Sequence, residues 1–166
     1  GTGFGTLVAT ASYITADFAF PYGANFAEVA VNTRTGEIRL DKFYALLDCG
    51  TPVNPELALG QIYGASMRAI GHSLSEAILY DAEGHPLTRD LRSYGAPKIG
   101  DIPRDFRAVL VPSDDKVGPF GAKSISEIGV NGAAPAIATA IHDACGVWLR
   151  EWHFTPEKIL TALEKL

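Results

Sequence analysis

Residues 26–47, FAEVAVNTRTGEIRLDKFYALL, decide the fold class of this chain. Phe26 to Val31 alternates in polarity, and Glu37 to Leu47 forms a second strand-like run. Between the two runs, Gly36 can supply the positive φ that a tight turn needs. The stretch therefore predicts a β-hairpin. The candidates for inward-facing positions on its first strand are Phe26, Val29 and Val31.

A long helix is expected after this hairpin. Asn54 can cap it, Pro55 suits its first position, and the helical pattern continues to about Leu79. Its apolar and small face is made of Ile62, Ser66, Ala69, Ser73 and Ala77. A glycine inside a helix costs about 1 kcal/mol against alanine, so several of them indicate close approach of another backbone or of a ligand. The helix contains Gly60, Gly64 and Gly71.

The rest of the chain mixes short strands, turns and helices. We expect a turn over 81–84 between short strands, strands over 106–111 and 148–152, and helices over 131–145, closed by Gly146, and over 156–166. Thr155 is expected to cap the last helix. Hairpins and helices in mixed order indicate an α+β fold, a mixed sheet with packed helices, rather than a doubly wound parallel sheet. No internal repeat is visible, so residues 1–166 are predicted to form a single domain.

Composition narrows the possible functions. The chain has 166 residues, 47% of them hydrophobic, and a net charge of −5, without the basic patch that tracks phosphates. No apolar stretch is long enough to span a bilayer, and no leader is visible. Cys49 and Cys145 fit neither a zinc site nor a disulfide framework and are interpreted as small core residues. Because the chain opens on Gly1 and its only methionine is Met67, we expect a processed product or one domain of something longer, with a trimmed tag as the alternative.

Two side chains stand out as candidates for chemistry. Glu127 lies within the Gly- and Pro-rich segment 112–132, and a loop of that length inside a compact domain is usually functional. Its carboxylate could be a general base, or it could merely cap the helix that follows. Gln61 lies among glycines on the long helix and could hold a polar ligand edge, or it could be an ordinary surface residue. None of the four histidines has the spacing of a metal pair, so no metal ligand is predicted.

Taken together and in order, these segments resemble one family, the molybdenum hydroxylases, which include xanthine dehydrogenase and aldehyde oxidase. The resemblance covers nearly the whole chain and points to the C-terminal part of the molybdopterin-binding catalytic subunit. The motifs that carry it are the hairpin, DCGTPVNPELALGQIYG at 48–64, YDAEG at 80–84, DIP at 101–103, GAKSISE at 121–127, PAIA at 135–138 and TPEK at 155–158.

The resemblance implies a cytoplasmic enzyme that hydroxylates an N-heterocycle of purine type or an aldehyde, with water as the oxygen source. Glu127 matches the family's active-site base, Gln61 matches a glutamine that contacts the molybdopterin, and Lys123 lies in the loop on the cofactor side. The molybdopterin would be shared with the remaining, upstream part of the subunit. Iron–sulfur clusters and FAD would be carried by other domains or subunits, so this chain alone would be incomplete.

Three hypotheses follow. The first is this hydroxylase fragment or small subunit. The second is a non-catalytic binding or interaction module that keeps the fold without the cofactor, which gains support from Arg68 and Ala69, where the family often has Gln and Gly. The third is a self-contained structural domain. A hydroxylase fragment should expose an apolar face that packs against the rest of the subunit, and a self-contained domain should not.

Overall fold

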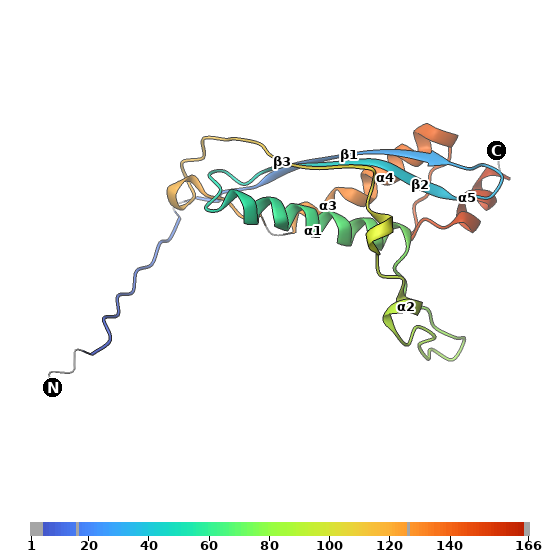
Figure 1. Ribbon diagram of the computed structural model, residues 1–166, viewed down its shortest axis with the longest axis horizontal. Helices are drawn as coiled ribbons and strands as arrows, with labels where there is room; N and C mark the ends of the chain where they lie inside the picture. The colour runs from blue at the N-terminus through green and yellow to red at the C-terminus, as the bar shows by residue number, and fades with distance from the viewer. Residues whose placement is uncertain (1–4, 16, 126, 165–166) are drawn as a thin grey trace.

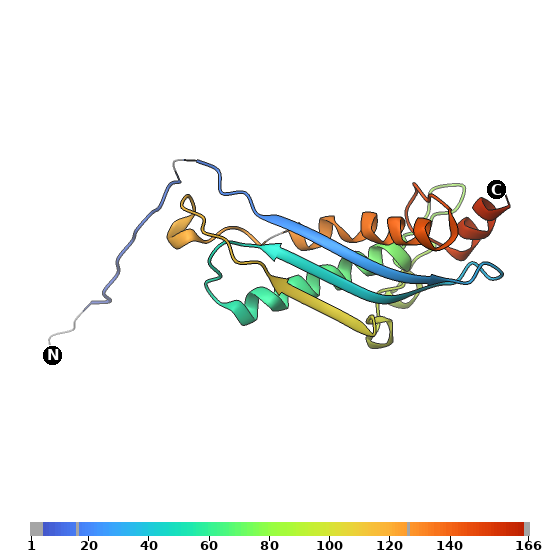
Figure 2. The same cartoon turned by 90° about the horizontal axis from the view of Figure 1, so that it is seen from above.

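The computed structural model describes residues 5–15, 17–125 and 127–164. Its sheet contains strands β1 (Tyr22–Val31), β2 (Ile38–Asp48) and β3 (Asp105–Leu110), in that spatial order. β1 runs antiparallel to β2, whereas β3 runs parallel to it, so the sheet is mixed (Figure 2). The predicted α+β class and the predicted hairpin are both confirmed.

The hairpin differs from the prediction at one inward position. Gly36 has the expected positive φ of +76°, and Val29 and Val31 pack against the core. Phe26 does not, because its side chain is 58% exposed. Alternate residues of a strand share a face, so Phe26 cannot share one with Val29 unless its own strand bulges. The register shift lies on the other strand, where Leu40 pairs with Val29 and Lys42 pairs with Glu28.

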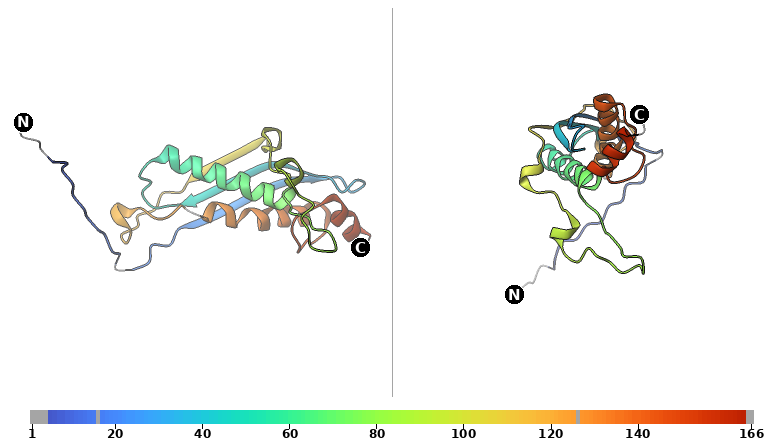
Figure 3. Two further views of the ribbon diagram at one scale, coloured as in Figure 1. Left: turned by 90° about the horizontal axis from the view of Figure 1, so that it is seen from below. Right: turned by 90° about the vertical axis from the view of Figure 1, so that its right-hand side faces the viewer.

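Helices α1 (Pro55–Leu74) and α4 (Ala133–Cys145) cover one face of the sheet, side by side (Figure 3). Asn54 caps α1 as predicted, with its side-chain oxygen accepting from the Leu57 N–H at 3.1 Å. α1 ends at Leu74 rather than near Leu79. The following residues bond elsewhere, since the Ser75 hydroxyl donates to the Gly95 carbonyl at 2.7 Å and the Ala77 N–H to the Tyr94 carbonyl at 3.0 Å.

The core lies between the sheet and these helices. Its fully buried side chains are Phe43 and Leu47 of β2, Ile62 of α1, Ile137 and Ile141 of α4, and Ile159 of α5 (Pro156–Leu163). Ser66, Ala69 and Ser73 of the predicted face of α1 are buried too, whereas Ala77 lies beyond the end of the helix. The Thr155 hydroxyl caps α5 by accepting from the Lys158 N–H, as the sequence predicts.

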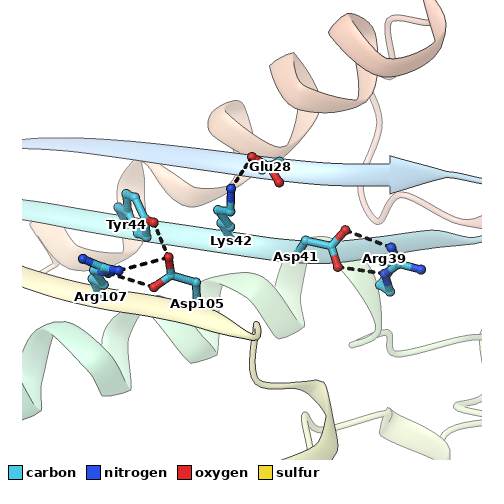
Figure 4. A network of polar contacts seen from close by, with 7 residues as sticks. All are labelled: Glu28, Arg39, Asp41, Lys42, Tyr44, Asp105 and Arg107. Carbon is cyan, nitrogen blue, oxygen red and sulfur yellow. Dashed lines mark hydrogen bonds and ion pairs between the residues drawn. The ribbon is translucent and has the colours of Figure 1, made fainter.

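The other face of the sheet carries charged pairs instead of helices (Figure 4). Lys42 pairs across the strands with Glu28 at 2.9 Å, and Arg107 pairs with Asp105 at 2.8 Å. The Tyr44 hydroxyl donates to the same Asp105 carboxylate. Because this face is polar, the sheet buries only its other face, which packs against α1 and α4.

The remaining elements are short. They are α2 (Leu91–Tyr94), the 3₁₀ turns η1 (Ile99–Asp101) and η2 (Pro119–Gly121), and α3 (Ile128–Asn131). The segment around α2 forms a lobe that hangs from the body (Figure 1). The turn at 81–84 is confirmed, with Gly84 at φ +86°, but its flanking strands reduce to one bridge between Tyr80 and Pro86.

Two further predictions need correction. The helix expected over 131–145 begins at Ala133, because Asn131 instead ends the separate short helix α3 and Gly132 lies between the two; Gly146 closes α4 at φ +78° as predicted. Residues 148–152 form no strand, and the Trp148 ring instead stacks on the His142 ring with centroids 4.2 Å apart. Cys49 is buried and Cys145 half-buried, both as free thiols. Within the described ranges, no helix is long and apolar enough to cross a membrane.

Candidate active site

The structure brings two of the three predicted site residues into one pocket. This pocket has a volume of about 450 Å³ and is lined by Gly60, Gln61, Gly64, Ala65 and Arg68 of α1 and by Glu127 and Val130 at α3. Gln61 and Glu127 are far apart in the sequence, and the packing of α3 on α1 places them around the same space. We call this space the α1–α3 pocket.

One wall of the pocket is a single face of α1. Gln61, Gly64 and Arg68 follow one another at spacings of three and four residues, which align side chains on a helix. Among the described residues, a Cβ placed at Gly60 or Gly64 would meet no atom within 4 Å outside the adjacent backbone of its own helix. These two glycines therefore leave a bare strip of backbone beside the Gln61 amide, open to a ligand or to another polypeptide segment.

A third glycine of α1 has a different role. A Cβ at Gly71 would lie 2.5 Å from Cγ of Pro97, so this glycine lets the 96–98 connection pack closely on the helix. The predicted close approach is thus confirmed within the chain at Gly71. At Gly60 and Gly64, close approach of a ligand or of another backbone stays a prediction, and such a group would lie in the α1–α3 pocket.

Glu127 stands at the N-terminus of α3, but its side chain does not cap the helix. Its carbonyl accepts from the N–H groups of Val130 at 2.9 Å and Asn131 at 3.2 Å, whereas its carboxylate makes no capping hydrogen bond. The side chain is exposed on the pocket wall. Of the two uses that the sequence leaves open, the capping one is therefore not observed, and the carboxylate is available to a ligand.

Packing against α1 fixes the position of α3. Gly129 is buried, and a Cβ there would lie 2.8 Å from Cβ of Ala65 on α1. Only a glycine allows the two backbones to come this close. Because Ala65 itself lines the pocket, this contact sets the separation between the Gln61 wall and the Glu127 wall.

Lys123, the third predicted site residue, does not line the pocket. Its side chain is only 3% exposed, and its Nζ lies 2.6 Å from Oδ2 of Asp48, at the end of β2. Asp115 lies 3.8 Å from the same Nζ, and the Tyr22 ring lies 5.3 Å from it. Lys123 belongs to the loop that leads to Glu127, and its side chain is engaged inside the chain.

Asp48 and Asp115 are the partners of Lys123, and the sequence pattern did not single them out. The Asp48 carboxylate also accepts from the Ser113 hydroxyl and from the Gly50 N–H at 2.9 Å. Burial alone would raise the pKa of Asp48, but the bonds from Lys123, Ser113 and Gly50 outweigh it and hold the pKa below its usual value. The run of charged residues at 114–116 inside an otherwise Gly- and Pro-rich loop is the only sequence signal that could have indicated these contacts.

Arg68 and Ala69, which depart from the family pattern, have different surroundings on α1. Ala69 is 2% exposed in the core and faces away from the pocket. Arg68 lies on the pocket wall and brings a planar cation with five donors. The wall thus combines an amide that both donates and accepts, a guanidinium and a bare backbone strip, which together suit a flat heterocycle with polar edges and an anionic group. Among the described residues, no three His, Cys, Asp or Glu side chains gather to hold a metal.

Comparisons with known proteins identify the family of this chain. A family model described as molybdopterin cofactor-binding domain matches residues 4–103. The probable hypoxanthine oxidase XdhD of Escherichia coli strain K12 is 93% identical over the whole chain, which covers 17% of that protein. PaoC, the molybdenum-binding subunit of an aldehyde oxidoreductase from the same strain, is 33% identical over 86% of the chain and 20% of its own length.

The fold also matches solved structures. The aldehyde oxidoreductase of Desulfovibrio gigas superposes with a TM-score of 0.78 and 35% identity, over 87% of this chain and 15% of its own. The chain therefore spans a fifth or less of the length of each of these relatives.

Proposed function

The chain belongs to the molybdopterin cofactor-binding domain family, and from this premise we propose that it forms the C-terminal part of the catalytic subunit of a molybdenum hydroxylase. The similarity to molybdenum-dependent oxidoreductases confirms the resemblance inferred from the motifs. The observation that carries the proposal is the meeting of Gln61 and Glu127 around the α1–α3 pocket.

The residues of the pocket fit the cofactor. The bare backbone at Gly60 and Gly64 would receive the flat pterin, the Gln61 amide would pair with its polar edge, and Arg68 would face its phosphate. When bound, the cofactor supplies a Lewis-acidic redox metal that activates water-derived oxygen. Because Arg68 adds a donor and a positive charge, it is compatible with this role and does not by itself indicate a relic without cofactor.

Glu127 would be the general base of the reaction. Its carboxylate is exposed on the pocket wall opposite Gln61, so it can accept a proton from the attacking oxygen when a substrate is held there. Positioned general bases contribute roughly 10²- to 10⁴-fold to a rate. The chain would thus contribute the base and one wall of the cofactor site.

The substrate class we propose is a purine-like N-heterocycle, with aldehydes as the second choice. The 93% identical relative is named a probable hypoxanthine oxidase, and the 33% identical one an aldehyde oxidoreductase subunit. Electrons would leave through iron–sulfur clusters and FAD on other domains or subunits, in a cytoplasmic enzyme. The remaining part of the subunit would provide the other walls of the site.

Exposed apolar side chains support the proposal that this chain packs against the remaining part of a larger catalytic subunit. Residues 5–15 lead away from the body as an extended chain (Figure 1) and present Leu7, Val8 and Ile14 to solvent. Val53 and Leu57 are also exposed, next to the start of α1. Apolar surface of this kind is typical of a face that packs against another polypeptide, as a hydroxylase fragment requires and a self-contained domain does not.

The test is metal and pterin analysis of the protein purified from its native source, combined with turnover of purines and aldehydes. The proposal predicts about one molybdenum and one pterin per catalytic subunit, and hydroxylation of a purine with oxygen derived from water. A protein without molybdenum and pterin would instead support the alternative, a binding module that keeps the fold without the cofactor.

A further inference from the structure

The buried ion pair of Lys123 and Asp48 connects the two halves of the candidate site. Asp48 ends β2, and the β2–α1 connection that follows it leads through Asn54 into the helix that carries Gln61. Lys123 lies in the loop that leads to Glu127. The 2.6 Å contact between their side chains therefore joins the segment that starts one wall of the pocket to the segment that supplies the other.

Backbone contacts reinforce this connection. The Lys123 N–H donates to the Cys49 carbonyl at 2.8 Å, and the Thr51 N–H donates to the Gly121 carbonyl at 2.8 Å. Gly50 and Gly121 both have positive φ, of +64° and +78°, which allows the two segments to lie this close. We call residues 48–51 and 121–123, with the Asp48–Lys123 pair between them, the clamp.

The loop is also tied to the clamp from its other side. Asp115 accepts from the N–H groups of Val117 at 2.8 Å and Gly118 at 3.1 Å, and its second oxygen lies 3.8 Å from the Lys123 ammonium. Ser113 donates to Asp48. The buried ammonium thus faces two carboxylates, and each carboxylate holds a different part of the loop.

Glu127 lies between two fixed points. On its N-terminal side is the clamp at Lys123, and on its C-terminal side is the close packing of Gly129 on Ala65 of α1. The side chain of Glu127 itself makes no capping bond that would hold it. These two anchors therefore set the backbone position of Glu127 relative to α1, the helix that carries Gln61.

We propose that Lys123 is a positioning residue that acts through the clamp to hold Glu127 opposite Gln61, and that it does not contact the cofactor. This inference rests on the proposed function, because it gives Lys123 a role only if Glu127 is the base. Its physical basis is that a misplacement of about 1 Å of a catalytic group can cost on the order of 10²-fold in rate.

The experiment compares kcat per bound molybdenum in the complete, cofactor-loaded enzyme that carries these residues. Lys123→Met removes the cation, and Lys116→Met is the matched control, since Lys116 is an exposed lysine of the same loop. We expect Lys123→Met to lower kcat per molybdenum by about 10- to 100-fold with KM nearly unchanged, and Lys116→Met to leave both at wild-type values.

A second variant keeps the test valid if Lys123→Met does not fold. Lys123→Met combined with Asp48→Asn removes both charges, so no uncompensated carboxylate stays buried. If the clamp positions Glu127, kcat per molybdenum stays low in this double variant. Wild-type kcat per molybdenum in the double variant would overturn the proposal, because the clamp would then be dispensable.

The pattern of results separates this inference from the alternatives. If Lys123 held the cofactor, Lys123→Met would lower molybdenum content while the remaining loaded enzyme kept its wild-type kcat, which would overturn the positioning role. Glu127→Gln is measured in the same series. If Glu127→Gln were fully active, the proposed function would fail. If Glu127→Gln were inactive while Lys123→Met and Lys116→Met had the same kcat per molybdenum, only the inference on Lys123 would fail.

Discussion

Gly64→Ala tests whether the bare strip of α1 is a cofactor surface. In the part of the chain that the structure describes, a Cβ at this position would meet no atom within 4 Å outside the adjacent backbone of α1, so the change should create no clash there. Alanine favours a helix over glycine by about 1 kcal/mol, and the cofactor-free protein should be as stable as the wild type or slightly more stable. The added methyl group would instead meet the pterin.

The magnitude follows from overpacking. Forcing an extra methyl group into a well-packed contact costs about 1–3 kcal/mol. Since 1.4 kcal/mol is tenfold in affinity, we expect cofactor binding to weaken by roughly 5- to 150-fold. Gly71→Ala is the matched control on the same helix. Its Cβ would lie 2.5 Å from Pro97, so it should lower thermal stability without directly touching the pocket.

The assay is the molybdenum and pterin content of each purified variant after dialysis, together with the thermal midpoint of the cofactor-free protein. We expect Gly64→Ala to lose cofactor at an unchanged or raised midpoint, and Gly71→Ala to show a lowered midpoint. Full cofactor content and activity in Gly64→Ala would refute the reasoning, because the strip could not then lie against the pterin.

Two further predictions concern the charges around the site. Arg68→Gln should weaken cofactor retention by roughly 10- to 150-fold, because a hydrogen bond to a charged group contributes about 1.5–3 kcal/mol. The control is Arg92→Gln, on the α2 lobe. Equal cofactor retention in both variants would argue against a contact between Arg68 and the cofactor phosphate. Asp48→Asn should destabilise the protein by about 3 kcal/mol at neutral pH, the lower end of the range for a broken buried pair, since Asp115 remains 3.8 Å from the Lys123 ammonium. Because the folded pKa of Asp48 is lowered, its contribution is complete above the ordinary aspartate pKa of about 3.9 and is lost as pH falls through the lower folded value. Unfolding measured between pH 2 and 7 should therefore show the gap between variant and wild type closing in acid, and a gap that is constant with pH would contradict the assignment.

Local signals predicted much of the fold. Gly36 marked the hairpin turn, Asn54 and Thr155 marked the starts of α1 and α5, and Gly146 marked the end of α4. Each of these is a property of one residue and its neighbours, which the sequence carries directly.

The errors have a different origin. Phe26 and Val29 are three residues apart on a strand that does not bulge, so their side chains lie on opposite faces of β1, which strand alternation alone indicates. α1 ends early because residues 94–95 bind the chain beyond it, and local patterns do not register such a contact with a separate segment.

In the candidate site, too, residues with local signals could be predicted from the sequence, and a contact between distant segments could not. Glu127 and Gln61 could be singled out from the glycines around them and from the family resemblance, and the structure places both on one pocket. The position of Lys123 could not be predicted, because its partner Asp48 lies at the end of a distant strand. The family resemblance implies that Lys123 lies in the loop on the cofactor side, whereas packing turns its side chain toward Asp48 inside the chain.

The most direct test of the central claim is the rate at which excess purine substrate reduces the Glu127→Gln enzyme in a single turnover, measured on protein with a known molybdenum content. Glu83→Gln, in the exposed turn at 81–84, is the control. The account predicts that Glu127→Gln retains its molybdenum and is reduced about 10²- to 10⁴-fold more slowly than the wild type, while the control is unaffected. A fully loaded Glu127→Gln enzyme that is reduced at the wild-type rate would contradict the account.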